Sequence, residues 1–207
     1  ITSIQKRKVR EKEERRREIL TTAAMLFARK GFHHVKMDEI AEKAGFSKGT
    51  LYLYFENKEM LFISIIIEKS KQLTAQLESV IECNQTFETC LRNFIESTLN
   101  FFIQNRPYFK LLHSEKMSMT LEDHYKLHDY AKKSMDSFYQ LITRIVTIGN
   151  ETCYFKNFDN GVIAKSLRGL INSFLFDIMC HEEKINIEIA ANNIMNVFLN
   201  GVQAKKQ

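Results

Sequence analysis

Residues 37–62, MDEIAEKAGFSKGTLYLYFENKEMLF, contain two short segments with apolar residues at helical spacing. Gly45 interrupts the spacing, which predicts helices over about 37–44 and 48–54. Ser47 is a candidate N-cap for the second helix. Two short helices joined by such a turn form a helix-turn-helix. Its small core is predicted to contain Ile40, Ala41, Ala44, Phe46, Leu51 and Phe55.

The second helix of this motif is short, so most of its side chains are free to contact DNA in the major groove. Lys48 can donate to guanine O6 and N7, and the Thr50 methyl can contact a thymine methyl. Gly49 has no Cβ, so the backbone can approach DNA closely at this position. Tyr52 and Tyr54 can donate to phosphate oxygens, which fixes register without reading sequence.

The basic charge of the chain lies in its first quarter. Residues 1–58 hold 14 Lys and Arg against 8 Asp and Glu, a net charge of +6, whereas residues 59–207 carry −1. This asymmetry favours a polyanionic partner, although Lys6–Arg17 taken alone could also be a solvated tail. Lys58 opens the next helix, where a bound phosphate would offset its conflict with the helix dipole.

The 207-residue chain is predicted to be all-α. It has one Pro, seven Gly and 44% apolar residues, no segment alternates with period two, and no apolar run reaches the length of a membrane span. Four Cys without CxxC spacing, and no signal peptide, favour a cytoplasmic protein. A helix-turn-helix domain at 1–58 and a helical ligand-binding and dimerisation domain at 59–207 are expected. The nine predicted helices are 10–30, 37–44, 48–54, 58–82, 87–105, 107–115, 121–148, 160–180 and 187–200.

Three stretches carry a specific resemblance: ILTTAAMLFARKGF (19–32), MDEIAEKAGFSKGTLYLYF (37–55) and NKEML (57–61). They resemble the DNA-binding domain of the TetR family of bacterial transcriptional regulators. The resemblance implies an all-helical homodimer that binds a palindromic operator, usually represses, and releases DNA when a small molecule binds. It also assigns DNA contacts by matching position to Ser47, Lys48, Gly49, Thr50, Tyr52, Tyr54 and Lys58.

Two positions depart from this family pattern. Val35 and Lys36 stand where many members have Thr, so a side-chain cap or phosphate donor is missing, and Lys36 is expected to contact phosphate instead. Leu53 stands where many members have His or Tyr, which removes another possible phosphate donor.

The last two helices are predicted to form a two-fold symmetric dimer interface. The helix at 160–180 is apolar around much of its circumference, whereas a surface helix of a monomer should show one apolar stripe. Gly169 is expected to allow close helix approach, and the alternative is that both helices are buried in one subunit. The predicted interface residues are Leu167, Leu170, Ile171, Phe174, Ile178, Ile194 and Phe198.

The part of the chain between these regions is rich in aromatic residues and Met. Most of these side chains are expected to form the hydrophobic core, and some of them are expected to line a ligand pocket. Apolar walls favour a hydrophobic or amphipathic effector, and the sequence leaves its charge open between cationic and acidic. The predicted pocket residues are Phe94, Phe102, Phe109, His113, Met117, Tyr125, Phe138, Phe174 and Asp177.

Other functions have weaker support in the sequence. His124 and His128 lie at metal-binding spacing, but no third ligand is evident, so neither a metal nor another cofactor is expected. No nucleotide-binding, metalloprotease or hydrolase motif occurs, and an enzyme is the alternative from a different class of protein. A DNA-binding regulator without a small-molecule inducer is the stronger of the two alternative functions.

Overall fold

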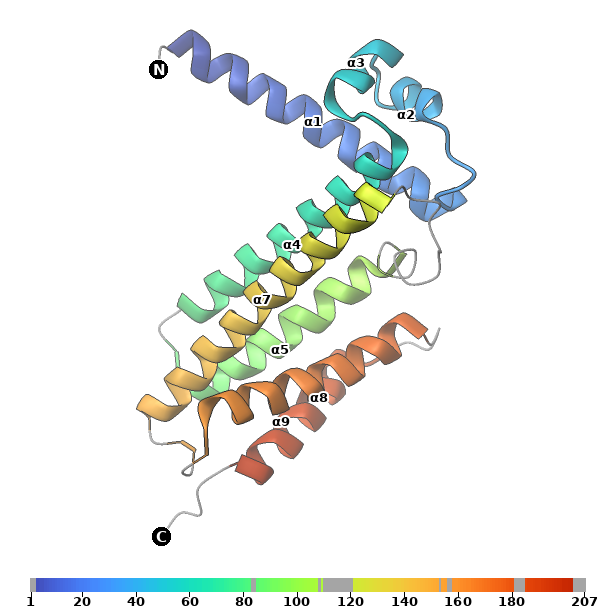
Figure 1. The fold of residues 1–207 in the computed structure, drawn as a ribbon. Helices are drawn as coiled ribbons and strands as arrows, with labels where there is room; N and C mark the ends of the chain where they lie inside the picture. Colours follow the sequence, from blue (N-terminus) through green and yellow to red (C-terminus); the bar gives the residue numbers. More distant parts are fainter. Residues whose placement is uncertain are drawn as a thin grey trace. The chain divides into compact units, whose positions relative to one another are not determined.

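The computed structural model describes residues 3–82, 85–107, 109, 121–152, 154–155, 158–180 and 185–202 (Figure 1). These residues confirm the predicted all-α class. No helix among them has the length and apolar character needed to cross a lipid bilayer. The helices are α1 (Ser3–Lys30), α2 (Met37–Lys43), α3 (Lys48–Tyr54), α4 (Lys58–Glu82), α5 (Phe87–Gln104), α7 (Leu121–Glu151), α8 (Asn160–Cys180) and α9 (Ile187–Val202).

The chain divides into two compact units. Unit 1 comprises Ile1–Lys69 and Leu111–His128, and unit 2 comprises Ser70–Lys110 and Asp129–Gln207. Helices α4 and α7 each contribute residues to both units. The division into domains after residue 58 stays a prediction.

An aromatic cluster forms the centre of unit 1. Phe27 of α1, Phe32 of the following loop and Phe62 of α4 are at most 1% exposed. Their ring centroids lie 5.3 to 6.0 Å apart, a separation typical of favourable aromatic pairs. Gly31, with φ +80°, ends α1 and turns the chain toward this cluster. The cluster therefore holds α1, the loop and α4 together under the helix-turn-helix.

Most helix starts lie where the sequence predicts them, because short polar side chains cap them. The Asn57 Oδ1 accepts from the Met60 amide at 2.7 Å and the Thr86 Oγ1 from the Thr89 amide at 3.3 Å. The Asp159 Oδ1 accepts from the Val162 amide at the start of α8, and the Asn186 Oδ1 does the same at α9. Each cap satisfies an amide that has no partner inside the helix.

Three helix ends differ from the prediction. Helix α1 begins at Ser3 and not near residue 10, so the basic stretch Lys6–Arg17 is helical. Helix α9 continues to Val202, because Gly201 keeps a negative φ and does not end it. Helix α7 continues through Gly149 to Glu151. The helix predicted over 107–115 lies largely outside the described residues.

Gly149 remains inside α7 because it is packed against aromatic rings of unit 2. A Cβ at this position would lie 2.4 Å from the Phe155 ring and 2.9 Å from the Phe87 ring. Phe87 and Phe155 are themselves 5.3 Å apart between centroids, and Phe198 of α9 lies 5.8 Å from Phe155. The glycine therefore permits close packing of α7 against this aromatic cluster and does not act as a helix terminator.

Candidate nucleic-acid interface

The helix-turn-helix of unit 1 has the geometry that the sequence predicts. Gly45 takes φ +73°, and the Phe46 amide donates to the Ala41 carbonyl at 2.9 Å across the turn. Ser47 is the N-cap of α3, and its Oγ accepts from the Thr50 amide at 3.1 Å. Ile40 and Leu51 are fully buried between the helices. These contacts fix the angle at which α3 leaves the turn.

Helix α3 leaves most of its surface free. Leu51 is its one buried residue, whereas Ser47, Lys48, Gly49 and Tyr52 are exposed. Thr50 and Tyr54 are half-buried. The structure therefore brings the predicted DNA-contact residues of α3 together at one exposed helix.

One exposed residue of α3 has no predicted DNA-contact role. The Leu53 side chain is 84% exposed on this helix. The sequence reasoning treated it only as a missing phosphate donor. Its position on α3 makes it a candidate for apolar contact with a thymine methyl.

Lys48 is held by α2 through an ion pair. Its Nζ lies 2.8 and 2.9 Å from the two carboxylate oxygens of Asp38, and both side chains are 61% exposed. The hydrogen bond to Asp38 raises the pKa of Lys48 above its ordinary value. An exposed pair of this kind contributes little to stability, so Lys48 can exchange Asp38 for a DNA acceptor.

Lys58 has a structural role that the sequence did not predict. Its Nζ donates to the Phe32 carbonyl at 2.9 Å and to the Val35 carbonyl at 3.1 Å. The same nitrogen lies 4.3 Å from the centroid of the Phe32 ring. Two of its three N–H groups therefore hold the loop between α1 and α2, and one remains for the predicted phosphate contact.

Lys36, in contrast, is an exposed residue with no capping role. It precedes α2 with extended backbone, and no side chain caps this helix start. The absence of a cap agrees with the departure from the family pattern at this position. The exposed ammonium is free to contact phosphate, which stays a prediction.

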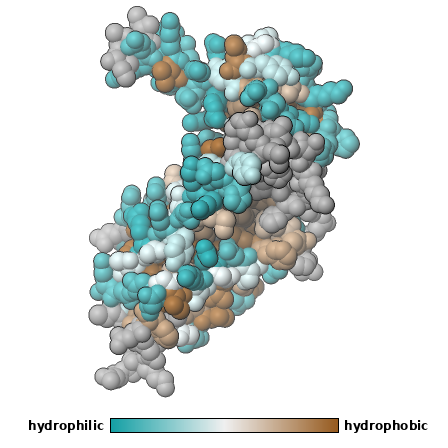
Figure 2. All heavy atoms as spheres, viewed as in Figure 1, coloured by the Kyte–Doolittle hydropathy of each residue, from teal (hydrophilic) through white to brown (hydrophobic). Residues whose placement is uncertain are grey.

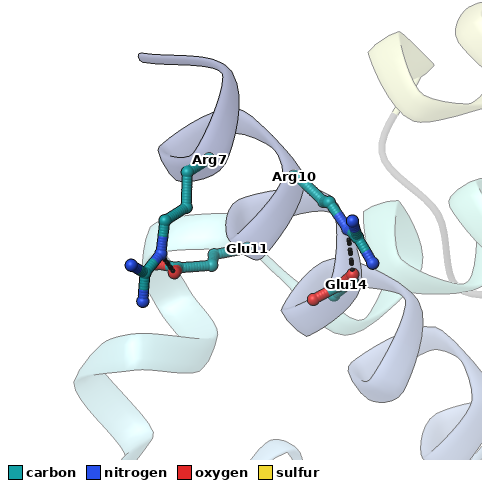
Figure 3. A network of polar contacts seen from close by, with 4 residues as sticks. All are labelled: Arg7, Arg10, Glu11 and Glu14. Atoms are coloured by element: carbon teal, nitrogen blue, oxygen red, sulfur yellow. Dashed lines mark hydrogen bonds and ion pairs between the residues drawn. The ribbon is translucent and has the colours of Figure 1, made fainter. Parts of the chain in front are cut away.

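The first half of α1 is a charged arm. In Figure 1 it extends past α2 and α3, and Figure 2 shows it as mainly hydrophilic. Arg7 pairs with Glu11 and Arg10 with Glu14, each at 2.8 Å and one helical turn apart (Figure 3). The hydrogen bond from Arg7 lowers the pKa of Glu11. Among the described residues, Lys6, Lys8, Lys12 and Arg15 form no ion pair.

The arm joins the DNA-binding helices at its base. The Arg16 guanidinium carbon lies 5.5 Å from the ring centroid of Phe55, the residue that ends α3. A cation above an aromatic face is a favourable contact. Arg16 therefore links the arm to the end of the recognition helix.

The predicted effector residues are distributed over different environments. Phe94 is fully buried, with its ring 5.9 Å from that of Phe138, so it belongs to the core of unit 2. The Phe102 and Phe109 rings stack at 4.2 Å, and Phe174 is partly buried against the same core. Tyr125 is 75% exposed in the single chain, and Asp177 is an exposed residue of α8, so their place in a pocket stays a prediction. His113 and Met117 lie outside the described residues.

The predicted dimer residues fall into a fully buried group and a partly buried group. Leu167, Ile171, Ile178, Ile194 and Phe198 are at most 2% exposed within the single chain, so they stabilise the protomer and cannot form its outer surface. Leu170 and Phe174 are partly buried. The sequence did not separate the inner from the outer apolar face of these helices.

Four other apolar residues of α8 and α9 are exposed in the single chain. Val162 and Phe176 of α8 are 53% and 56% exposed, and Ile189 and Val197 of α9 are 58% and 61% exposed. Figure 2 shows apolar residues on the surface in the region of α8. A Cβ at Gly169 would meet no atom within 4 Å, which leaves space on this face for another helix.

Comparison with known proteins agrees with these features. Residues 19–65 match the family of bacterial regulatory proteins named tetR. A fatty acid metabolism regulator protein of Bacillus subtilis is 23% identical over 95% of this chain and all of that protein. The regulator QacR of Staphylococcus aureus is 27% identical over 89% of this chain and 96% of QacR.

Solved structures show the same fold. The regulator FadR of Bacillus subtilis, solved in complex with stearoyl-CoA, superposes with a TM-score of 0.72 and 22% identity. The match covers 90% of this chain and 98% of that one. These structures show that the whole chain shares their fold, and the helix-turn-helix with the match over residues 19–65 identifies the DNA-binding domain as that of the TetR family of bacterial transcriptional regulators.

Proposed function

We propose that this chain is a repressor that binds a palindromic operator as a homodimer and releases it when a hydrophobic small molecule binds. The observation that carries the DNA-binding role is the exposed, N-capped helix α3 with Lys48, Gly49 and Tyr52 on its surface. A short helix fixed at its N-terminus and free on its outer side suits insertion into the major groove. The net charge of +6 on residues 1–58 adds the electrostatic attraction to phosphate.

The homodimer would form through the exposed face of α8 and α9. On α8, Val162, Gly169 and Phe176 lie seven residues apart and share one side of the helix. A small residue such as Gly169 between two large apolar residues allows a second helix to approach closely. A two-fold axis would pair this face with itself and place two α3 helices for a palindrome.

Replacement of Phe176 by Asp tests this interface. A carboxylate in an apolar contact would be desolvated, so the variant should sediment as a monomer at micromolar concentration. Met135→Asp makes the same kind of change at a 60% exposed residue of α7 and should remain a dimer. A wild-type monomer at this concentration would contradict the proposal.

The effector would be hydrophobic or amphipathic. Phe102, Phe109, Phe138 and Phe174 are partly buried side chains of unit 2 that pack against its core, as the walls of an apolar site would. One relative is named for fatty acid metabolism, and one structural neighbour was solved with stearoyl-CoA. Both names agree with an effector that has an acyl chain.

The response would require different affinities for the effector in the DNA-bound and free states. A hundredfold loss of operator affinity needs about 2.7 kcal/mol of differential binding. Helix α4 contributes residues to both units, so it is the proposed carrier of the change. If a bound effector left operator affinity unchanged, the regulator would be one without an inducer.

Selection of binding sites from a random duplex library, followed by titration of the selected site, tests the DNA-binding role. We expect a palindromic site and, for 8–10 neutralised phosphates, a slope of log K against log salt of about −7 to −9. A slope near zero would contradict the electrostatic contribution.

A further inference from the structure

Arg106 lies just after the end of α5, and its guanidinium has one buried edge. Its Nε and Nη2 atoms are buried, and neither has a hydrogen-bond partner in the part of the chain that the structure describes. Both nitrogens lie on the same edge of the guanidinium, because Nη2 is the terminal nitrogen on the side toward which the Nε hydrogen points. The unsatisfied donors therefore form a parallel pair.

An unsatisfied pair of this kind calls for an acceptor. Arginine stays protonated in proteins, so the edge cannot lose its charge to avoid the cost of burial. Buried polar groups nearly always have a partner in the protein, in ordered water or in a ligand. Two parallel N–H groups match the two oxygens of a carboxylate or a phosphate, which they bind in bidentate geometry.

The other arginines of unit 2 differ from Arg106. Arg92 donates to the Asn192 Oδ1 at 2.6 Å and lies 3.7 Å from Glu96. Arg168 lies over the Tyr139 ring at 5.2 Å, and Arg144 is exposed. Arg106 alone among these four has buried, unpaired nitrogen atoms in the described structure.

The surroundings of Arg106 in the chain are aromatic. Phe102 and Phe109 precede and follow it at helical spacing, and their rings stack at 4.2 Å. Asn105, the buried polar neighbour, is already satisfied, because its Nδ2 and its amide both donate to the Phe101 carbonyl. A single buried cationic edge therefore remains in a segment whose neighbouring side chains are aromatic.

We propose that Arg106 binds the acidic head group of the effector, a carboxylate or phosphate carried on a hydrophobic body. The proposal rests on the effector response proposed above and narrows it to anionic amphiphiles. An uncharged head group offers no pair of oxyanions to this edge, and a cationic head group would be repelled by it.

Four probes with the same twelve-carbon chain test the proposal: dodecanoate, dodecyl phosphate, 1-dodecanol and dodecyltrimethylammonium. Their affinities for the full chain would be measured by calorimetry below the concentration at which any forms micelles. We expect one or both anions to bind about tenfold or more tightly than the alcohol, because a charge-assisted pair of hydrogen bonds is gained.

The variant Arg106→Gln separates the head group from the tail. It should weaken the anions about tenfold and leave the alcohol within about twofold. Arg144→Gln, which removes an exposed arginine of the same unit, should change neither. Without a ligand, Arg106→Gln should melt no more than about 4 °C below wild type, because no described acceptor loses its donor.

Each outcome has a distinct meaning. Alcohol or cation binding as tight as that of the anions would overturn the role of Arg106 and leave a hydrophobic effector intact. Saturable binding of none of the four would overturn the apolar effector and this proposal together. A large loss of melting temperature in ligand-free Arg106→Gln would show that the edge is paired inside the chain, which also overturns it.

Discussion

The Lys58 ammonium donates to the carbonyl of Phe32, 26 residues earlier in the chain, at 2.9 Å. The contact joins the first turn of α4 to the loop that precedes α2, and a second bond to Val35 reinforces it. Lys58 is half-buried, so these bonds are partly shielded from water. A residue that sequence reasoning assigns to DNA therefore also stabilises the DNA-binding unit.

Replacement of Lys58 by Met tests the structural role. The stem and its packing are kept, but two carbonyls lose a charged donor, so the free energy of unfolding should fall by about 1.5–3 kcal/mol. Urea denaturation measures this loss. Lys36→Ala is the matched control: its stability should be unchanged, while the salt slope should become shallower by about 0.9 per subunit. Equal stability of Lys58→Met and wild type would contradict the structural role.

The ion pair between Asp38 and Lys48 predicts a gain of function. In Asp38→Asn, Lys48 loses its carboxylate partner, and one negative charge near the DNA is removed. Affinity for all duplexes should rise about two- to fivefold. The ratio of the affinity for the selected operator to that for a scrambled duplex should fall. Fluorescence anisotropy with selected and scrambled duplexes measures both.

Glu42→Gln removes a charge of the same sign from an exposed residue of the same helix without affecting Lys48. It should increase affinity less than Asp38→Asn. If the two variants behave alike, the general charge of α2 matters and the specific pair does not.

Two glycines of the helix-turn-helix should respond in opposite ways. A Cβ at Gly49 would have its nearest neighbour, the Ser47 Oγ, at 4.0 Å, so Gly49→Ala fits the folded chain. Alanine favours the helix by about 0.5–1 kcal/mol, so this variant should be at least as stable as wild type but bind the operator more weakly. Gly45→Ala forces φ +73° on a residue with a Cβ and should lose about 1–2 kcal/mol of stability. Thermal melting and operator titration of both variants check the contrast, and full operator affinity of Gly49→Ala would refute the close approach.

The helix-turn-helix and the starts of several later helices were predictable because local rules determine them. Ser47, Asn57, Thr86 and Asn186 are short polar side chains at helix starts, and each accepts from an amide three residues on. Gly31 and Gly45 take the positive φ that glycine allows. Gly149 looked the same in the sequence, but its role depends on two distant phenylalanine rings, which no local pattern reveals.

The faces of α8 could not be predicted for a related reason. The helix is apolar on two sides, and periodicity does not tell which side meets its own protomer. The structure buries Leu167 and Ile171 and exposes Val162 and Phe176. Lys58 and Arg106 were similarly beyond reach, because their roles depend on carbonyls and burial that only the folded chain provides.

Tyr154 predicts a stability change at alkaline pH. Burial and a hydrogen bond to the Glu88 carboxylate raise its pKa to about 12 from the ordinary tyrosine value of 10.0. The neutral phenol is thus favoured in the folded chain, so its contribution to stability is complete below pH 10 and is lost as the pH rises toward about 12. Tyr154→Phe cannot ionise, so its stability should fall less steeply than that of wild type over this range. Denaturation at several pH values compares the two, and parallel curves would contradict the shift.

The charged arm of α1 predicts two opposite changes in salt dependence. Lys8 and Lys12 are exposed and form no ion pair among the described residues, so Lys8→Gln with Lys12→Gln should keep the stability of wild type. If both contact phosphates beside the operator, the salt slope should become shallower by up to about 0.9 for each lysine. Glu11→Gln with Glu14→Gln releases Arg7 and Arg10 from their 2.8 Å pairs and should make the slope steeper. Slopes unchanged in both double variants would show that the arm does not reach DNA, and that the basic charge of residues 1–58 acts through α3 and its neighbours alone.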